Sequence, residues 1–169
     1  RVVAGGRNRQ ESVRNGLAAV SDDVDIVAVH DGVRPFVLVE LIEATIEKAA
    51  KSGAVILGMP AVETVKQVGQ NAIEATLPRE RIMLAQTPQV FRRALLDRAF
   101  ESAERDGVLG TDEASLVEHL NEDVQVMRGS DRNIKITRPT DLSLARFLLD
   151  EEREPVEYKG FLIVPDPQD

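Results

Sequence analysis

The hydrophobic positions follow two different spacings along the chain. Short continuous apolar runs at 25–29 and 54–59 are typical of strands that are buried on both faces. Apolar residues three and four positions apart predict helices at 39–51 and 92–106. Because the two kinds of segment alternate, we expect an α/β layered fold with a mostly parallel sheet over residues 1–150. Further helices are expected at 10–20, 111–120 and 139–149, and further strands or strand ends at 1–4, 83–86, 124–127 and 133–137.

Two segments depart from this alternation. Residues 62–81 carry alternating polar and apolar side chains on either side of Gly69-Gln70-Asn71, which predicts a solvated β-hairpin. A lone hairpin is only marginally stable in water, so we expect this one to lie against another surface, such as a second subunit. Residues 151–169 are first acidic and later interrupted by prolines, and they are interpreted as a C-terminal tail.

Composition excludes several classes of protein. The 169 residues include no cysteine, so a disulfide framework and a thiolate nucleophile are both excluded. Asp and Glu number 29 against 21 Lys and Arg, and this net charge of -8 argues against a broad nucleic-acid surface. No apolar run reaches the roughly 18 to 20 residues of a membrane helix, and no signal peptide is recognisable. A cytoplasmic enzyme or binding protein, with no nucleic acid and no membrane as partner, is therefore expected.

The predicted loops are basic for so acidic a chain. In open α/β sheets, ligands bind in the loops beyond the carboxyl ends of the strands. Cations lie in three such loops, at 5–9, at 31–34 and at 128–138, and Lys66 and Arg79 lie on the two limbs of the hairpin. Each cation alone is more often a solvated surface charge, but together they suggest a phosphate pocket, because phosphates need several cationic donors. Lys135 is a candidate to contact a reacting phosphate.

Several of these residues allow two interpretations. Gly6 either makes an ordinary turn or lets the backbone approach a ligand closely. Ser12 and Thr111 either cap helices or present hydroxyls to a ligand. Asp31 and Arg34 either form an ion pair that holds their own loop together or bind a hydroxyl and a phosphate of a ligand. His30 could be a general base, but a histidine at the end of a buried strand is more often a hydrogen-bonding residue of the core.

Six segments, in this order, resemble one enzyme family: GGRNRQESVRNGL, VHDGVRPF, VETVKQV, TLPRERIMLAQTPQVF, GTDEASLVE and NIKITRPTDL. The chain is similar over residues 2–149 to the 2-C-methyl-D-erythritol 4-phosphate cytidylyltransferases. The resemblance implies a Rossmann-like nucleotidyltransferase that transfers CMP from CTP to the polyol phosphate and releases pyrophosphate, in isoprenoid precursor biosynthesis. It also implies Mg²⁺ with the CTP, and a homodimer joined through the hairpin arm at 62–81.

The resemblance also implies a role for individual residues. Gly6 and Ser12 are expected at the cytosine, and Gly32 at the ribose. The methylerythritol phosphate is expected to lie against four residues of one chain, and against two from the partner's arm. Lys135 is expected to position the attacking phosphate, and Lys135 and Arg79 are the predicted catalytic residues. The acceptor set is Asp31, Arg34, Thr87 and Thr111, with Thr64 and Arg79 from the arm.

Two departures from the family pattern affect these expectations. Arg7 is a cation where some members carry an acidic residue. The family's glycine-rich segment, of the kind PAAGxGxR followed by a lysine, is not found in the 169 residues. We therefore expect an N-terminal part to be missing and the chain alone to be catalytically incompetent. The alternatives are a cytidylyltransferase for ribitol 5-phosphate, a non-catalytic dimerisation or ligand-binding fragment, and a plain α/β domain with basic loops.

Overall fold

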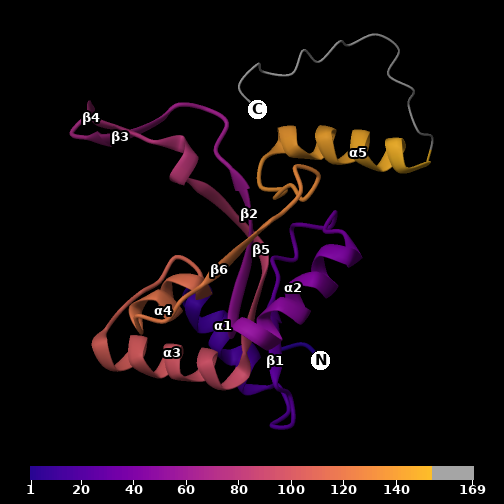
Figure 1. Cartoon of the computed structure of the whole chain (residues 1–169). Coiled ribbons are helices and arrows are strands. Elements are labelled where there is room, and N and C mark those ends of the chain that lie inside the picture. Colours follow the sequence, from indigo (N-terminus) through magenta and orange to yellow (C-terminus); the bar gives the residue numbers. More distant parts are fainter. Residues whose placement is uncertain (154–169) are drawn as a thin grey trace.

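The computed structural model describes residues 1–153, which form a four-stranded sheet, a separate hairpin and the helices around them (Figure 1). The strand order in the sheet is β1-β5-β2-β6. The sheet strands are β1 (Ile26–Val29), β2 (Ala54–Pro60), β5 (Met83–Arg92) and β6 (Gln125–Arg128). The helices are α1 (Arg9–Ala18), α2 (Val39–Ser52), α3 (Arg93–Asp106), α4 (Glu113–His119) and α5 (Pro139–Arg153), with a 3₁₀ turn at Arg79–Arg81.

The α/β class is confirmed, but among the described strands the sheet is mixed and not mostly parallel. β2 runs parallel to β6, whereas β5 runs antiparallel to both of its neighbours, β1 and β2. The reason lies in the connection between β2 and β5. The chain leaves the sheet at the end of β2, passes through the hairpin and returns directly beside β2, and a direct return of this kind gives an antiparallel pair.

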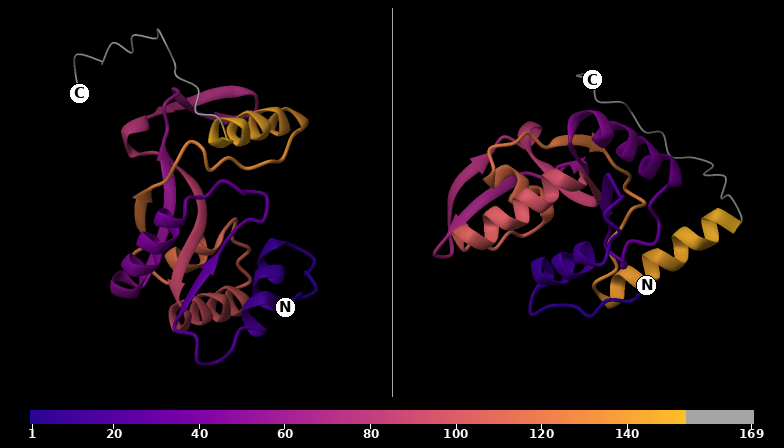
Figure 2. Two further views of the ribbon diagram at one scale, coloured as in Figure 1. Left: turned by 90° about the vertical axis from the view of Figure 1, so that its right-hand side faces the viewer. Right: turned by 90° about the horizontal axis from the view of Figure 1, so that it is seen from below.

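The sheet is covered by helices on both faces, which explains the continuous apolar runs (Figure 2). Ala54 and Ile56 of β2 pack with Phe91 of β5 against α1, α3 and α4. Val55, the residue between them, packs on the opposite face with Ala49 of α2. Alternate residues of one strand therefore enter two different cores, as the pleat of a strand requires.

The predicted hairpin is confirmed and stands away from the sheet (Figure 1). Its strands are β3 (Val65–Gly69) and β4 (Ala72–Leu77), joined by a turn in which Gln70 and Asn71 have positive φ. Val68 and Ile73 on the hairpin are 60% and 65% exposed. In the single chain, the hairpin therefore exposes these apolar side chains.

Several predicted boundaries were wrong. Residues 1–4 have no regular structure, and 133–137 form no strand, although Ile136 donates its amide to the carbonyl of Val33. The strand predicted at 83–86 continues through residues 87–89 to Arg92. Helix α5 runs beyond residue 149 to Arg153 and packs through Ala145 and Leu148 on Phe36 and on residues 134 and 136. The rest of the predicted tail, 154–169, lies outside the described residues.

None of the helices in residues 1–153 is both long enough and apolar enough to span a membrane.

Candidate functional site

Five of the predicted site residues line one cavity of about 180 Å³, which we call the Asp31 cavity. They come from four separate parts of the chain: the loop after β1, the middle of β5, the segment before α4 and the segment before α5. The five are Asp31, Arg34, Thr87, Thr111 and Lys135, and Arg9, Gln89 and Asp112 line the same cavity.

The carboxylate of Asp31 is the electrostatic centre of this cavity. Lys135 Nζ lies 3.1 Å and Arg34 Nε lies 3.5 Å from its Oδ2, and Arg9 Nη2 lies 3.7 Å from its Oδ1. Burial alone would raise the pKa of Asp31. The hydrogen bond and charge of Lys135, together with the two arginines, outweigh burial and hold the pKa of Asp31 below its ordinary value. Asp31 therefore stays ionised and gathers three cations at one point.

Thr87 is fixed at an irregularity of β5. The pairing of β2 with β5 shifts between Ile56 and Leu57, which pair with Gln89 and Gln86, so Thr87 and Pro88 have no partner there. The Thr87 hydroxyl accepts the backbone N–H of Asp31 at 3.0 Å and lies 3.0 Å from His30 Nδ1. The other ring nitrogen of His30 donates to the carbonyl of Arg34 at 3.0 Å. His30 therefore ties the loop after β1 to Thr87 as a hydrogen-bonding residue, but it is exposed, so the expected place in the core was wrong.

A buried amide pair supports the cavity from behind. Asn133 is fully buried, and its side-chain amide donates to the Thr87 carbonyl at 2.9 Å. The backbone carbonyl of Asn133 accepts from Arg34 Nη1 at 2.8 Å. The amide of Gln86 donates to the Ser130 carbonyl at 2.8 Å. These bonds fix the loop that carries Lys135 against β5.

The start of α4 corrects one sequence interpretation. Asp112, not Thr111, is the N-cap: its Oδ1 accepts the backbone N–H of Ser115 at 3.0 Å. Its Oδ2 also accepts the side-chain amide of Gln89 at 2.8 Å, so α4 is tied to β5. Thr111 is thereby free of the capping role and lines the Asp31 cavity.

The glycine loop before α1 does not line the Asp31 cavity. Gly6 donates its N–H to Ser12 Oγ at 2.9 Å, and Ser12 Oγ donates to the Asn8 carbonyl at 2.8 Å. A Cβ on Gly6 would lie 2.2 Å from the Cβ of Glu11, so this position has no room for a side chain. A Cβ on Gly32 would meet nothing within 4 Å. Gly6 is therefore needed for close packing of the loop, whereas Gly32 is not.

The two arm residues also lie elsewhere within the chain. Arg79 Nη1 donates to the Val62 carbonyl at 2.9 Å, which braces the base of the hairpin. Its side chain is 56% exposed, and Thr64 is exposed as well. Neither residue lines the Asp31 cavity of its own chain.

The sequence reasoning missed the residues that hold this cavity in shape. Arg9 was one cation among several in the loop 5–9, and nothing singled out its bidentate pair with Glu113, a carboxylate that is only 1% exposed. Gln89 and Asn133 were missed as well. A polar residue inside an apolar strand, such as Gln89, is the only hint that a sequence offers of a buried hydrogen bond.

The described residues do not form a cage for a metal ion. No group of three or more His, Asp or Glu side chains in residues 1–153 could hold one. The carboxylates at the Asp31 cavity are already engaged, Asp31 by cations, Asp112 as a helix cap and Glu113 by Arg9. A Mg²⁺ ion would have to take most of its ligands from a bound substrate and water, as Mg²⁺ often does.

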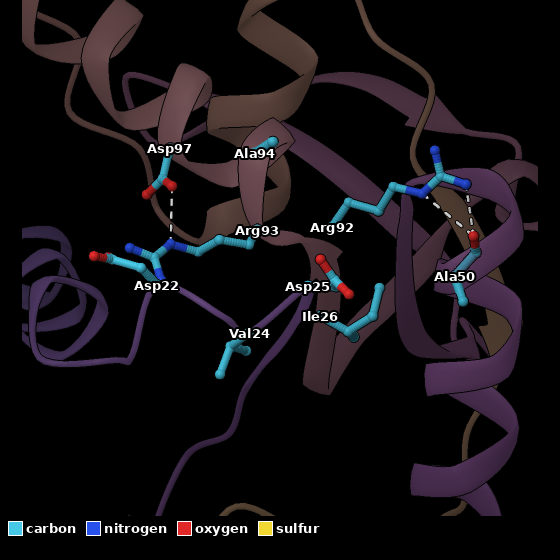
Figure 3. Close-up of a pocket in the computed structure, with 9 residues that line it drawn as sticks. All are labelled: Asp22, Val24, Asp25, Ile26, Ala50, Arg92, Arg93, Ala94 and Asp97. Carbon is cyan, nitrogen blue, oxygen red and sulfur yellow. Dashed lines mark hydrogen bonds and ion pairs between the residues drawn. The ribbon is translucent and has the colours of Figure 1, made fainter.

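A larger cavity, of about 590 Å³, lies at the opposite end of β1, around the start of that strand and the end of β5 (Figure 3). Its two arginines have partners within the fold. Arg92 donates to the carbonyl of Ala50 at the end of α2, and Arg93 pairs with Asp97 at 2.8 Å. Since Arg92 ties β5 to the end of α2 and Arg93 is paired within α3 itself, this cavity is a less suitable anion site than the Asp31 cavity.

Fold and site together define an α/β protein with a small cavity in which three cations surround one carboxylate. The chain belongs to the 2-C-methyl-D-erythritol 4-phosphate cytidylyltransferase (IspD) family, whose profile matches residues 1–151. The proteins of that name from Solibacter usitatus and Acidobacterium capsulatum are 56% identical over 156 residues and 57% identical over 154 residues. These matches cover 90% and 88% of this chain, which spans about 64% of the length of each relative.

Solved structures of this family are similar to the chain in fold as well. The 2-C-methyl-D-erythritol 4-phosphate cytidylyltransferase from Thermus thermophilus matches with a TM-score of 0.80 and 39% identity, covering 88% of this chain and 72% of that one. The 4-diphosphocytidyl-2C-methyl-D-erythritol synthase from Anaerococcus prevotii matches with a TM-score of 0.83 and 34% identity, covering 89% and 67%. The recognised family and the α/β fold are thereby confirmed.

Proposed function

We propose that this chain carries the acceptor half of a cytidylyltransferase site, which transfers CMP from CTP to 2-C-methyl-D-erythritol 4-phosphate. Family membership supports the reaction and the two substrates. The observation that carries the proposal for this chain is the convergence of Arg9, Arg34 and Lys135 on Asp31. A phosphate ester is the ligand that such a set of cations fits best, because each cation can donate to its oxygens.

The reaction makes few demands on acid–base chemistry. An oxygen of the acceptor phosphate attacks the α-phosphorus of CTP, a new P–O bond forms, and the bond to the bridging oxygen breaks so that pyrophosphate leaves. The nucleophile is already an anion, and catalysis is therefore mainly positioning and neutralisation of charge. In this proposal Lys135 positions the attacking phosphate, while Asp31, Arg34, Thr87 and Thr111 hold the acceptor.

The hairpin is proposed to complete the site of a second subunit. Its apolar residues Val68 and Ile73 are exposed in the single chain, and such side chains favour burial against a partner. Arg79 and Thr64 lie on the same arm and away from the cavity of their own chain. A homodimer in which each arm reaches the partner's cavity would add Arg79 as a further cation there.

The nucleotide is proposed to bind along the glycine loop, with Gly6 and Ser12 at the cytosine, Gly32 at the ribose and Mg²⁺ on the triphosphate. The close packing of Gly6 supports a fixed loop surface, on which a flat base can lie. When bound, the metal ion would neutralise part of the charge of the triphosphate. A cytoplasmic location also stays a prediction.

The test combines binding with turnover. Calorimetric titration with 2-C-methyl-D-erythritol 4-phosphate measures the acceptor half on the chain as it stands. Pyrophosphate release with CTP and Mg²⁺ is then measured on the chain, and on the chain joined to the part of the Solibacter usitatus relative that it does not span. We expect acceptor binding by the chain and pyrophosphate release by the joined protein, faster with this acceptor than with ribitol 5-phosphate.

Lys135→Ala provides the residue-level check, with Lys51→Ala on the exposed end of α2 as the matched control. Removing a charge that stabilises the reacting phosphates should lower turnover about 100-fold, whereas the control should be unaffected. Binding without pyrophosphate release in either protein would favour a non-catalytic binding fragment. No binding of the acceptor, with Lys135→Ala equal to wild type, would leave only an α/β domain with basic loops.

A further inference from the structure

Arg9 is held in the Asp31 cavity by a carboxylate that solvent hardly reaches. Its Nη1 and Nη2 donate to the two oxygens of Glu113 at 2.6 and 2.9 Å. The Glu113 side chain is 1% exposed, whereas Arg9 is 36% exposed. The carboxylate thus lies behind the guanidinium, and the cation is the member of the pair that faces the cavity.

The ion pair of Arg9 and Glu113 has a high desolvation cost for a contact that only stabilises the fold. Glu113 loses nearly all its hydration, and a buried ion pair is often no more stabilising than apolar residues of similar size. Burial opposes the charge of Arg9 as well, but the hydrogen bonds and charge of Glu113 outweigh it and raise the pKa of Arg9. Arg9 therefore stays protonated, and Glu113 holds its guanidinium at a fixed place.

Arg9 also has donors to spare. A guanidinium carries five N–H groups, and the pair with Glu113 uses two of them. The contact with Asp31, at 3.7 Å, is too long for a hydrogen bond. Since its head lies in the same cavity as Arg34, Thr87 and Lys135, the remaining donors are available to a ligand there.

We propose that Arg9 is a further phosphate-binding residue of the Asp31 cavity and that Glu113 is its positioning residue. The inference rests on the proposed function, because it takes the cavity to be a phosphate site. The ligand chemistry is a phosphate ester, which could belong to the acceptor or to the nucleotide.

The experiment isolates the contribution of the phosphate. Titrations compare 2-C-methyl-D-erythritol 4-phosphate with phosphate-free 2-C-methyl-D-erythritol, and CTP with cytidine, on the full chain. The variants are Arg9→Gln/Glu113→Gln, which leaves no unpaired buried charge, Arg9→Lys, and Glu113→Asp. Arg93→Gln is the matched control, because Arg93 is likewise paired with an acid and only 18% exposed but lines the distant cavity (Figure 3).

The double variant should lose about 10- to 100-fold in affinity for one of the two phosphate ligands, with no change for its phosphate-free partner. Arg9→Lys should recover part of this loss, since the charge remains without the planar fork. Glu113→Asp keeps both charges but shortens the side chain that holds Arg9 by one methylene, and it should lower the affinity for that ligand several-fold. Arg93→Gln should leave all four affinities unchanged.

The outcomes separate the possible failures. Loss for the polyol phosphate alone, or for CTP alone, supports the inference and identifies which phosphate Arg9 binds. If wild type binds a phosphate ligand and the double variant binds it equally well, the inference is overturned and the proposed function stands. A wild-type chain that binds neither phosphate ligand overturns both. Equal losses for the phosphate and phosphate-free compounds would show a structural role and also overturn it.

Discussion

Replacement of Asn133 by alanine tests whether the cavity depends on a buried hydrogen bond. Asn133 is 0% exposed, and its amide donates at 2.9 Å to the Thr87 carbonyl, at the point where β5 skips its pairing with β2. In Asn133→Ala this carbonyl keeps no side-chain donor and stays buried. A buried acceptor left without a partner costs about 1–3 kcal/mol. We therefore expect the free energy of unfolding to fall by that amount.

Urea unfolding followed by circular dichroism measures the change, with Asn15→Ala as the matched control. Asn15 makes the same kind of bond, to the Ala4 carbonyl at 3.2 Å, but on an exposed face of α1. Water replaces that bond, so the control should stay within about 0.5 kcal/mol of wild type. Equal effects of the two substitutions, both below that value, would refute the claim that the Asn133 amide supports the cavity.

Three further outcomes are expected. Gly6→Ala should lower the free energy of unfolding in urea by about 1–3 kcal/mol, because the new Cβ would lie 2.2 Å from the Cβ of Glu11. Gly32→Ala places its Cβ in open space and should lower it by less than about 0.5 kcal/mol, so equal effects of the two would contradict the packing argument. Because folding lowers the pKa of Asp31, this carboxylate should stabilise the fold fully at pH values well above the ordinary aspartate pKa of about 3.9, and less as pH falls through the lower folded pKa. If the free energy of unfolding of wild type exceeds that of Asp31→Asn by the same amount in acid as at neutral pH, the cation cluster does not stabilise the ionised Asp31. Ile73→Asp should convert a dimer into a monomer in analytical ultracentrifugation, and an unchanged sedimentation coefficient would rule out the arm as the interface.

The sequence predicted the elements best where the local pattern was strong. Helices α2 and α3 begin and end within a residue or so of the predicted 39–51 and 92–106, because an apolar stripe at helical spacing indicates both type and extent. The hairpin was recognisable since its strands alternate about a turn of Gly, Gln and Asn. The direction of β5 was missed, because the residues of a strand do not by themselves show whether its neighbour runs parallel or antiparallel to it; the return of the chain beside β2 decides that.

The candidate site divides in a similar way. Sequence alone identified the residue types that a phosphate needs, and the order of the six motifs identified the family, since both depend only on which residues occur and where. Five of the proposed residues do meet in one cavity. The tertiary structure decided that Arg9 joins them, because Glu113, 104 positions later in the chain, is buried behind it. It also decided that Asn133 supports Thr87, since burial and the partner of a buried amide exist only once distant segments pack together.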